Sequence, residues 1–308
     1  MARCYGIATR LEPLRDTAHY GGMRIRLMAR LAGLSPRRRV LAALVALIAV
    51  AVAAFGGVRL SHAANNPTPA YPAASRPSYV LLVPGYGGST AALDQLAARI
   101  RATGRIATVV RLPGNGTGDL AVQAQTLNGY VNQAFQAGSG PVTVIGYSAG
   151  GVVAWLWDVN YGGAAKARRI ITLGSPLHGA QLAALGAAFV PGECPTACQQ
   201  LVPGSSLLGM LQNSPAASRP PWLSMWTTND QVVQPPDSAR LPGAVNVSLQ
   251  SVCPGAVIQH GELPTNPLVT GIVLRSLGKN PLEAPGKGQC HSLQALGGAA
   301  QHPGTGTG

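Results

Sequence analysis

A serine between paired glycines has the surroundings in this sequence that best suit nucleophilic chemistry. Ser148 is the centre of GYSAG (residues 146–150), a G-x-S-x-G motif. The β-branched run Val142–Tyr147 precedes it, and a helical pattern over Ala149–Asn160 follows it. A serine on such a strand-to-helix turn is strained and exposed, and side chains at the glycines would collide with neighbouring backbone. The motif therefore predicts a nucleophile, whereas the alternative is a serine in an ordinary glycine-rich turn.

A second glycine-rich segment, VLLVPGYGGS (residues 80–89), lies well upstream of this serine. It reads as a strand that runs into a loop, and such a loop supplies one backbone N–H to the oxyanion of a serine hydrolase. The residue after the nucleophile supplies the other, so the predicted donors are Tyr86 and Ala149. A phosphate-binding loop is the alternative, but the Lys-Ser/Thr pair and the full dinucleotide spacing are missing.

Histidines and carboxylates after Ser148 are candidates for a general base and the acid that orients it. With a nucleophile turn of this kind the chain order is serine, acid, histidine. His260 lies in the loop IQHGELP between an expected strand and an expected helix, with His291 as second choice. Asp230 directly follows the expected strand that ends in WTTN, where a carboxylate can hold the imidazole in its required tautomer. Asp237 is the fallback acid.

Short apolar runs that alternate with helical patterns must position these residues. This alternation is typical of βαβ units, so the predicted fold class is α/β with a mainly parallel central sheet flanked by helices. The expected strands are Tyr79–Val83, Ala107–Leu112, Val142–Tyr147, Arg169–Leu173, Leu223–Trp226 and Ala244–Leu249. The expected helices are Thr90–Thr103, Leu120–Phe135, Ala149–Asn160 and Pro267–Leu277. We expect one catalytic domain over residues 78–281 and a C-terminal tail over 282–308.

Residues 176–221 interrupt the alternation between two expected strands. This excursion holds two cysteines, several prolines and the short amphipathic piece Ser206–Leu211. A partial cap over the site and a plain surface loop are both open interpretations. The apolar side chains that the excursion offers for an acyl-binding groove are Leu182, Leu185, Phe189, Val190, Leu207, Leu208 and Leu211.

Several of these segments together resemble a known family. VLLVPGYGGS, GNGTGD, VIGYSAGG, ITLGSPLHGA, TTNDQVV and QHGELP are similar to segments of the secreted bacterial triacylglycerol lipases, especially those of actinobacterial type. The resemblance covers residues 78–278. It implies an α/β-hydrolase fold, a lipid or small ester substrate, and a catalytic triad of Ser148, Asp230 and His260. The sequence departs from the family at Pro84, where many of these lipases have a histidine outside the triad.

Residues 1–63 have the pattern of an export leader. Three consecutive arginines precede the uncharged, mostly apolar run 40–58, and Ser61-His62-Ala63 follows it with small residues at a plausible cleavage point before Ala64. The pattern predicts a signal peptide, with membrane attachment through an uncleaved 40–58 segment as the alternative. Either way the positive flank places the rest of the chain outside the cytoplasm, secreted or extracytoplasmic. Residues 64–77, rich in proline and alanine, are expected to be a linker.

Four of the five cysteines lie beyond the leader, at Cys194, Cys198, Cys253 and Cys290. An even number in an exported domain indicates disulfides. Four cysteines allow three connectivities, of which we favour the local pair 194–198 and the longer pair 253–290. A metal site is the alternative, but C-x3-C without a nearby histidine is poor spacing for zinc.

The net charge of +13 is concentrated in the leader, and no basic stripe with interleaved aromatic residues follows it. The sequence therefore does not indicate a nucleic-acid partner. Triad chemistry needs no cofactor, and the sequence contains no pattern that predicts a metal site. An envelope acyltransferase or thioesterase is an alternative that uses the same acyl-enzyme. A non-catalytic surface binding protein that keeps the fold as a scaffold is an alternative of another class.

Overall fold

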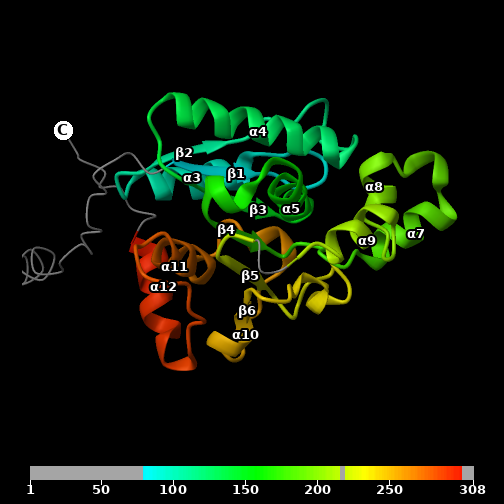
Figure 1. The fold of residues 1–308 in the computed structure, drawn as a ribbon. Helices are drawn as coiled ribbons and strands as arrows, with labels where there is room; N and C mark the ends of the chain where they lie inside the picture. The colour runs from blue at the N-terminus through cyan, green and yellow to red at the C-terminus, as the bar shows by residue number, and fades with distance from the viewer. Residues whose placement is uncertain (1–78, 216–218, 300–308) are drawn as a thin grey trace, which may run out of the picture. The chain divides into compact units, whose positions relative to one another are not determined.

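Six parallel strands form the central sheet of the part of the chain that the computed structural model describes, residues 79–215 and 219–299 (Figure 1). The strands are β1 (Tyr79–Val83), β2 (Ile106–Val109), β3 (Val142–Tyr147), β4 (Ala167–Leu173), β5 (Trp222–Trp226) and β6 (Val245–Ser248). Their order across the sheet is β2-β1-β3-β4-β5-β6, and every neighbouring pair runs parallel. The predicted fold class is confirmed. β6 ends one residue earlier than expected because Leu249 begins a short helix.

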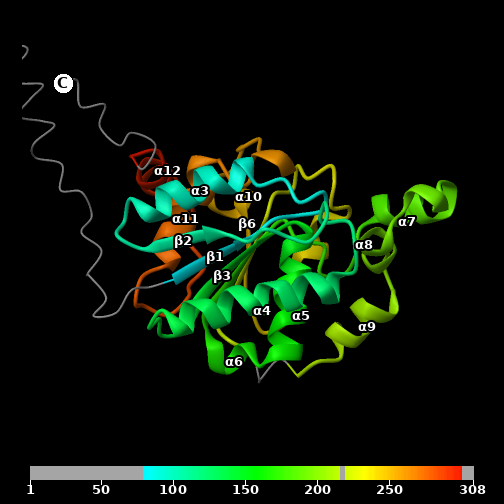
Figure 2. The same cartoon turned by 90° about the horizontal axis from the view of Figure 1, so that it is seen from above.

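Helices cover both faces of this sheet, as the two views in Figures 1 and 2 show. On one face lie α4 (Leu120–Gln136) and α5 (Ala149–Tyr161), with the short α6 (Gly163–Lys166) after them. On the other lie α3 (Ala91–Arg101) and α11 (Pro267–Ser276), together with α10 (Leu249–Val252) and α12 (Cys290–Ala299). The sheet is therefore a buried middle layer, which suits the near-continuous apolar sequence of its strands.

The alternation of side chains along β1 shows how one strand serves two cores. Val80 and Leu82 point into the cluster beneath α3 and α11, while Leu81 and Val83 point into the cluster beneath α4 and α5. All four are buried, because successive side chains of a strand point to opposite faces and both faces are covered. Both faces of the sheet are therefore packed against apolar cores.

Ordered structure continues past the boundary at residue 281 that the sequence suggested. Helix α12 packs against α11 through glycines, so the two backbones approach closely. A Cβ on Gly271 would lie 1.9 Å from the carbonyl oxygen of Leu293, and one on Gly297 would lie 1.8 Å from that of Pro267. Residues 290–299 therefore belong to the same packed unit as the expected catalytic domain.

The 176–221 excursion forms α7 (Gln181–Phe189), η1 (Pro191–Glu193), α8 (Thr196–Gln200) and α9 (Ser206–Gln212). Helix α8 is fastened to the start of α4, where Gln200 accepts a hydrogen bond from the Leu120 N–H at 2.8 Å and donates one to Asp119 at 3.0 Å. Leu208 and Leu211 are fully buried in the core beneath α5. They therefore do not line a groove, contrary to the sequence expectation.

Helix α7 differs from α8 and α9, because none of its residues is buried. The exposed side chains among the residues expected to line a groove are Leu182, Leu185, Phe189 and Val190. No helix within the described residues is both long enough and apolar enough to cross a membrane. The expected leader and linker, residues 1–77, lie outside the described part of the chain.

Candidate active site

Ser148 lies on the turn between β3 and α5 and has an unusual backbone conformation. Its φ is +53° and its ψ is −128°, and it is the one non-glycine residue with positive φ in the described part of the chain. Its N–H donates to the carbonyl of Leu173 at the end of β4, at 2.9 Å. Strain of this kind persists only where the surrounding structure imposes it, and it is typical of functional sites.

The glycines of the motif allow this turn to form. A Cβ on Gly146 would lie 2.5 Å from the Cα of Gly151, and a Cβ on Gly150 would lie 2.3 Å from the carbonyl oxygen of Val83. Each contact is with backbone, which cannot move aside as a flexible side chain can. The helix and the neighbouring strands consequently close around the serine only when both positions lack a side chain.

The structure brings the three residues predicted as a triad together. The Nε2 of His260 lies 3.0 Å from the Oγ of Ser148, and its Nδ1 lies 2.7 Å from the Oδ2 of Asp230. Histidine and aspartate are 5% and 2% exposed, whereas the serine is half-buried and faces solvent in part. The second choices lie elsewhere, with Asp237 exposed in η3 (Pro236–Ala239) and His291 in the first turn of α12.

The carboxylate of Asp230 is held by backbone on the side away from the histidine. Its Oδ1 accepts hydrogen bonds from the N–H groups of Val232 and Val233, at 2.9 and 2.8 Å. A buried carboxylate needs such partners, since burying an unpaired charge is costly. The two donors leave Oδ2 free and aimed at the imidazole of His260.

The backbone of His260 is held by the residue that precedes the nucleophile. His260 begins η4 (His260–Glu262), and its carbonyl oxygen accepts a hydrogen bond from the Tyr147 hydroxyl at 3.2 Å. The two rings lie 5.2 Å apart. Burial, together with the negative charge of Asp230, raises the pKa of Tyr147 to about 12, so the phenol stays protonated and able to donate at neutral pH.

The loop after β1 lies against the nucleophile. A Cβ on Gly85 would lie 2.9 Å from the Cβ of Ser148 and 3.4 Å from its Oγ. The loop turns back immediately, with the Gly88 N–H bonded to the Gly85 carbonyl at 3.0 Å. Among the described residues, neither the Tyr86 N–H nor the Ala149 N–H makes a backbone–backbone hydrogen bond outside the helices and strands. Ala149 also opens α5, where the partial positive charge of the helix end favours an anion.

Gly174 belongs to the site and was not anticipated from the sequence. It follows β4 with φ +54°, and a Cβ there would lie 3.2 Å from Nδ1 of His260 and 3.3 Å from Oδ2 of Asp230. The segment ITLGSP contains the pattern by which this position could have been found from the sequence. A glycine at the carboxyl end of the strand beside the nucleophile's strand must lie at the same edge of a parallel sheet.

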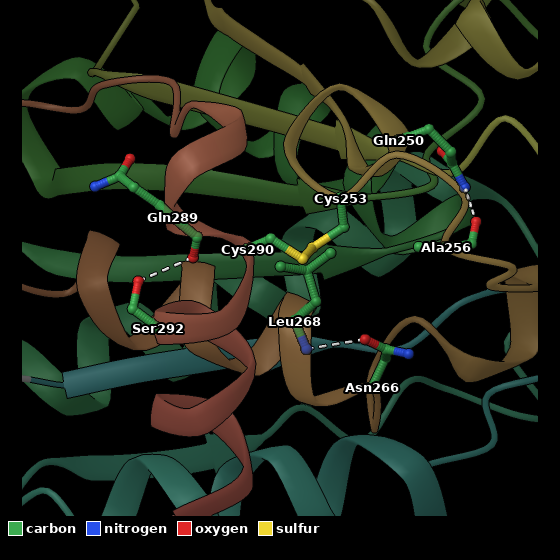
Figure 3. Close-up of a disulfide and its surroundings, with 8 residues drawn as sticks. All are labelled: Gln250, Cys253, Ala256, Asn266, Leu268, Gln289, Cys290 and Ser292. Carbon is green, nitrogen blue, oxygen red and sulfur yellow. Dashed lines mark hydrogen bonds between the residues drawn. A yellow bond between two sulfur atoms is a disulfide. The ribbon is translucent and has the colours of Figure 1, made fainter.

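Two disulfides are present in the described residues. Cys194 is bonded to Cys198 and Cys253 to Cys290, with Cα–Cα distances of 5.2 and 5.1 Å. These are the pairings favoured from the sequence, and Figure 3 shows the second one between the end of α10 and the start of α12. In the ranges 79–215 and 219–299, no cluster of three or more His, Cys, Asp or Glu side chains has an arrangement that could hold a metal ion.

Comparison with known proteins identifies relatives in sequence pattern and in fold. A sequence model of the alpha/beta hydrolase family matches residues 80–294. No curated protein matches the chain by sequence. The crystal structure of Aspergillus fumigatus lipase B is similar, with a TM-score of 0.59 and 19% identity over 72% of this chain and 56% of that one. The chain thus spans little more than half the length of the Aspergillus lipase.

Two further structures share the fold at low identity. The mature form of Bacillus licheniformis lipase BlEst2 has a TM-score of 0.50 and 22% identity over 59% of this chain and 84% of that one. A structure from the metagenome-derived lipolytic enzymes LipS and LipT has a TM-score of 0.51 and 19% identity, over 68% of this chain and 96% of that one. At such identities the likeness establishes the fold.

Proposed function

The chain belongs to the alpha/beta hydrolase family, and from that premise we propose that it is an exported carboxylic ester hydrolase with Ser148 as its nucleophile. His260 acts as general base and Asp230 orients it. The observation that carries the proposal is the pair of hydrogen bonds made by one imidazole, 3.0 Å to the serine Oγ and 2.7 Å to the carboxylate. This is the arrangement that nucleophilic catalysis by serine requires.

In the first half of the proposed reaction, Ser148 Oγ attacks the ester carbonyl carbon and its proton passes to Nε2 of His260. The carbonyl oxygen becomes an anion, which the N–H groups of Tyr86 and Ala149 stabilise. Collapse of this tetrahedral intermediate breaks the bond to the alcohol oxygen, and the imidazolium returns the proton to the leaving alkoxide. The acyl group remains attached to the serine as an ester.

In the second half, water attacks the acyl-enzyme while His260 takes one of its protons. The same two N–H groups stabilise the second oxyanion. The bond to Ser148 Oγ then breaks, the serine recovers its proton from the imidazolium, and the carboxylic acid leaves. Throughout, Asp230 stabilises the positive imidazolium by its charge and holds Nδ1–H in place.

An acyl chain is the substrate portion that we propose for the surface beside the site. Its support is the exposed apolar face of α7, where Phe189 is 79% exposed, together with a fold shared with lipases. Residues 227–235, between β5 and η3, form the loop that carries Asp230, here called the acid loop. Helix α7 begins close to it, because the N–H of Gln181 donates to the carbonyl of Gln234 at 2.9 Å. Gln234 in turn donates through its side chain to the backbone carbonyl of Asp230.

Export of the protein is proposed on two grounds. The leader sequence has the pattern of a signal for secretion. The two disulfides of the described residues are bonds that persist in oxidising compartments.

A panel of p-nitrophenyl esters from acetyl to long chain tests the proposed activity and its substrate class together. The protein is expected to hydrolyse them, and kcat/KM is expected to rise about fourfold per methylene while the chain is being buried, because each methylene contributes about 0.8 kcal/mol. No hydrolysis of any member contradicts the ester hydrolase proposal. If kcat/KM does not rise for chains longer than acetyl, the proposed acyl-binding surface is contradicted, whereas the proposed triad chemistry is not.

A further inference from the structure

The loops that carry Asp230 and His260 are joined by a buried threonine outside the triad. Thr227 follows β5 directly and is fully buried. Its Oγ1 donates to the carbonyl oxygen of Ile258 at 2.6 Å, two residues before the histidine. The same oxygen accepts from the N–H of Asn229 at 3.2 Å, next to the aspartate. One hydroxyl thus fixes the backbone on both sides of the acid–base pair.

Gln250 in α10 spans the same two loops from the outside. Its side-chain oxygen accepts from the N–H of Thr228 at 2.9 Å. Its Nε2 lies 3.0 Å from Oγ1 of Thr227 and 2.9 Å from Oδ1 of Asn229, both on the acid loop. It also lies 3.0 Å from the carbonyl oxygen of Ala256, a contact visible in Figure 3. Ala256 belongs to the base loop, residues 253–259, which joins α10 to η4 and leads into His260. The amide therefore bridges the acid loop and the base loop.

The turn that presents this carbonyl is anchored on its other side by a disulfide. Cys253 is bonded to Cys290 of α12, and the Ala256 N–H donates to the Cys253 carbonyl at 3.1 Å. In Figure 3 the disulfide and the contact between Gln250 and Ala256 hold the two sides of the same turn. The base loop is thus tied both to the acid loop and to the C-terminal helix.

We propose that Thr227 and Gln250 are positioning residues that hold His260 in line with both Ser148 and Asp230. The inference rests on the proposed function and adds residues that the triad does not contain. An imidazole can serve both neighbours only if the two loops keep their spacing, since a displacement of about 1 Å at a reacting group costs about a hundredfold in rate. The threonine hydroxyl donates to the Ile258 carbonyl and accepts from the Asn229 N–H, and its Oγ1 also lies within hydrogen-bond distance of Nε2 of Gln250.

Three variants and one control test this proposal in the full chain. Thr227→Val keeps the shape and loses the hydroxyl, whereas Thr227→Ser keeps the hydroxyl. Gln250→Ala removes the half-buried bridge without opening the core. Ser251→Ala is the matched control, because this neighbour in α10 is exposed and its hydroxyl donates to the local carbonyl of Ser248.

The readouts are kcat and KM on one p-nitrophenyl ester and the rate at which a fluorophosphonate replaces its fluoride with Ser148 Oγ. Both rates are expressed per folded molecule, counted by circular dichroism and active-site titration. We expect kcat and the labelling rate to fall about tenfold or more in Thr227→Val and Gln250→Ala, with KM within about twofold of the parent. Thr227→Ser and Ser251→Ala are expected to remain within about twofold of the parent in all three quantities, because they leave the bridging contacts intact.

Several outcomes overturn the proposal, and each differs from a failure of the proposed function. If Thr227→Val and Gln250→Ala have the kcat and the labelling rate of the parent, the proposed positioning role is contradicted. A rise in KM with unchanged kcat assigns the residues to substrate binding instead. A smaller fraction of folded molecules, with kcat and the labelling rate per folded molecule unchanged, shows that the residues contribute to stability alone. Failure of the proposed function appears separately, as a parent chain that neither hydrolyses esters nor labels at Ser148.

Discussion

Gly174 lies against Asp230 and His260, so this position accommodates no side chain without disturbing the acid–base pair. Alanine there is strained by φ +54° and brings a Cβ within 3.3 Å of Asp230 and 2.5 Å of Leu263. Gly174→Ala is therefore expected to lower the free energy of unfolding by more than the about 1–2 kcal/mol that positive φ costs a non-glycine residue. It is also expected to lower kcat by about tenfold or more, because it displaces the imidazole. Urea unfolding and ester hydrolysis measure the two effects.

Gly162→Ala is the matched control for this prediction. Gly162 has φ +69°, at the end of α5, but an added Cβ meets nothing within 4 Å. It is expected to lose about 1–2 kcal/mol of stability and no kcat per folded molecule. Equal effects of the two variants on kcat would contradict a special role for Gly174.

Buried Asp158 gives the fold a pH dependence that can be measured. Burial raises the pKa of this carboxyl from 3.8 to about 6, although the charge of Arg219 and a hydrogen bond from the backbone of Ala164 oppose the shift. The folded state then holds a proton that the unfolded state has lost, so the free energy of unfolding should fall as pH rises from about 4 to about 6.

Asp158→Asn removes the titrating group and should flatten this part of the stability curve. The measurement is chemical unfolding at closely spaced pH values, with the exposed Asp237→Asn as control. A parent curve that rises over this interval, or an Asp158→Asn curve with the parent's slope, would show that burial does not control the carboxyl.

The three residues of the proposed triad could be selected from the sequence, because each lies in a recognisable local pattern, and the structure places them within hydrogen-bond distance of one another. Ser148 lies in a motif with a strand before it and a helix after it, and Asp230 and His260 follow from their order and from the strands before them. Thr227 and Gln250 have no such pattern, because the positioning role proposed for them depends on loops that meet only in the folded chain.

At the scale of elements, the two disulfides should differ in their contribution to stability. Cys253–Cys290 closes a separation of 37 residues and Cys194–Cys198 one of 4. In the chain-entropy treatment, the longer loop contributes about 4 kcal/mol and the shorter about 2 kcal/mol, since the unfolded chain loses more freedom when distant residues are joined. Paired cysteine-to-alanine variants should therefore lower the unfolding free energy in that order.

Urea unfolding of the two paired variants measures this difference. Ester hydrolysis per folded molecule gives a second readout, because only the longer disulfide supports the base loop. Equal losses of stability, or a larger loss from the 194–198 pair, would contradict the assignment of the longer bridge as the main covalent constraint.

The expected strands and helices match the structure closely except that β2 ends at Val109 and not at Leu112. In the excursion, the expected helical piece is present as α9, but the expected groove residues Leu208 and Leu211 are buried. The expected strand over Val142–Tyr147 matches β3 to the residue, because its apolar run is buried on both sides. Leu208 and Leu211 looked equally suited to a groove and to a core, since amphipathic spacing does not tell which layer a helix faces. Helix α12 lies in the segment expected to be a C-terminal tail, and it packs against α11 through Gly271 and Gly297, which carry no hydrophobic period, and through Leu293.

At the scale of the whole molecule, the parallel sheet explains how distant segments form one site. The loops after β1, β3, β4 and β5 and the segment beyond β6 contribute Gly85, Ser148, Gly174, Asp230 and His260 respectively. Parallel strands have their carboxyl ends at the same edge of the sheet. A chain of βαβ units therefore brings these loops together although they are far apart in the sequence. The proposed site therefore depends on the topology of the sheet as well as on the types of the residues that its loops contribute.

The most direct test of the account is to locate the covalent adduct that a fluorophosphonate forms with the active protein. Peptide mass spectrometry of the labelled parent should find one phosphonate, on Ser148, with ester hydrolysis lost in proportion to labelling. Ser148→Ala should take up no label, hydrolyse no ester and unfold at the same urea concentration as the parent. An adduct on another residue that abolishes activity, or hydrolysis retained by folded Ser148→Ala, would contradict the central claim.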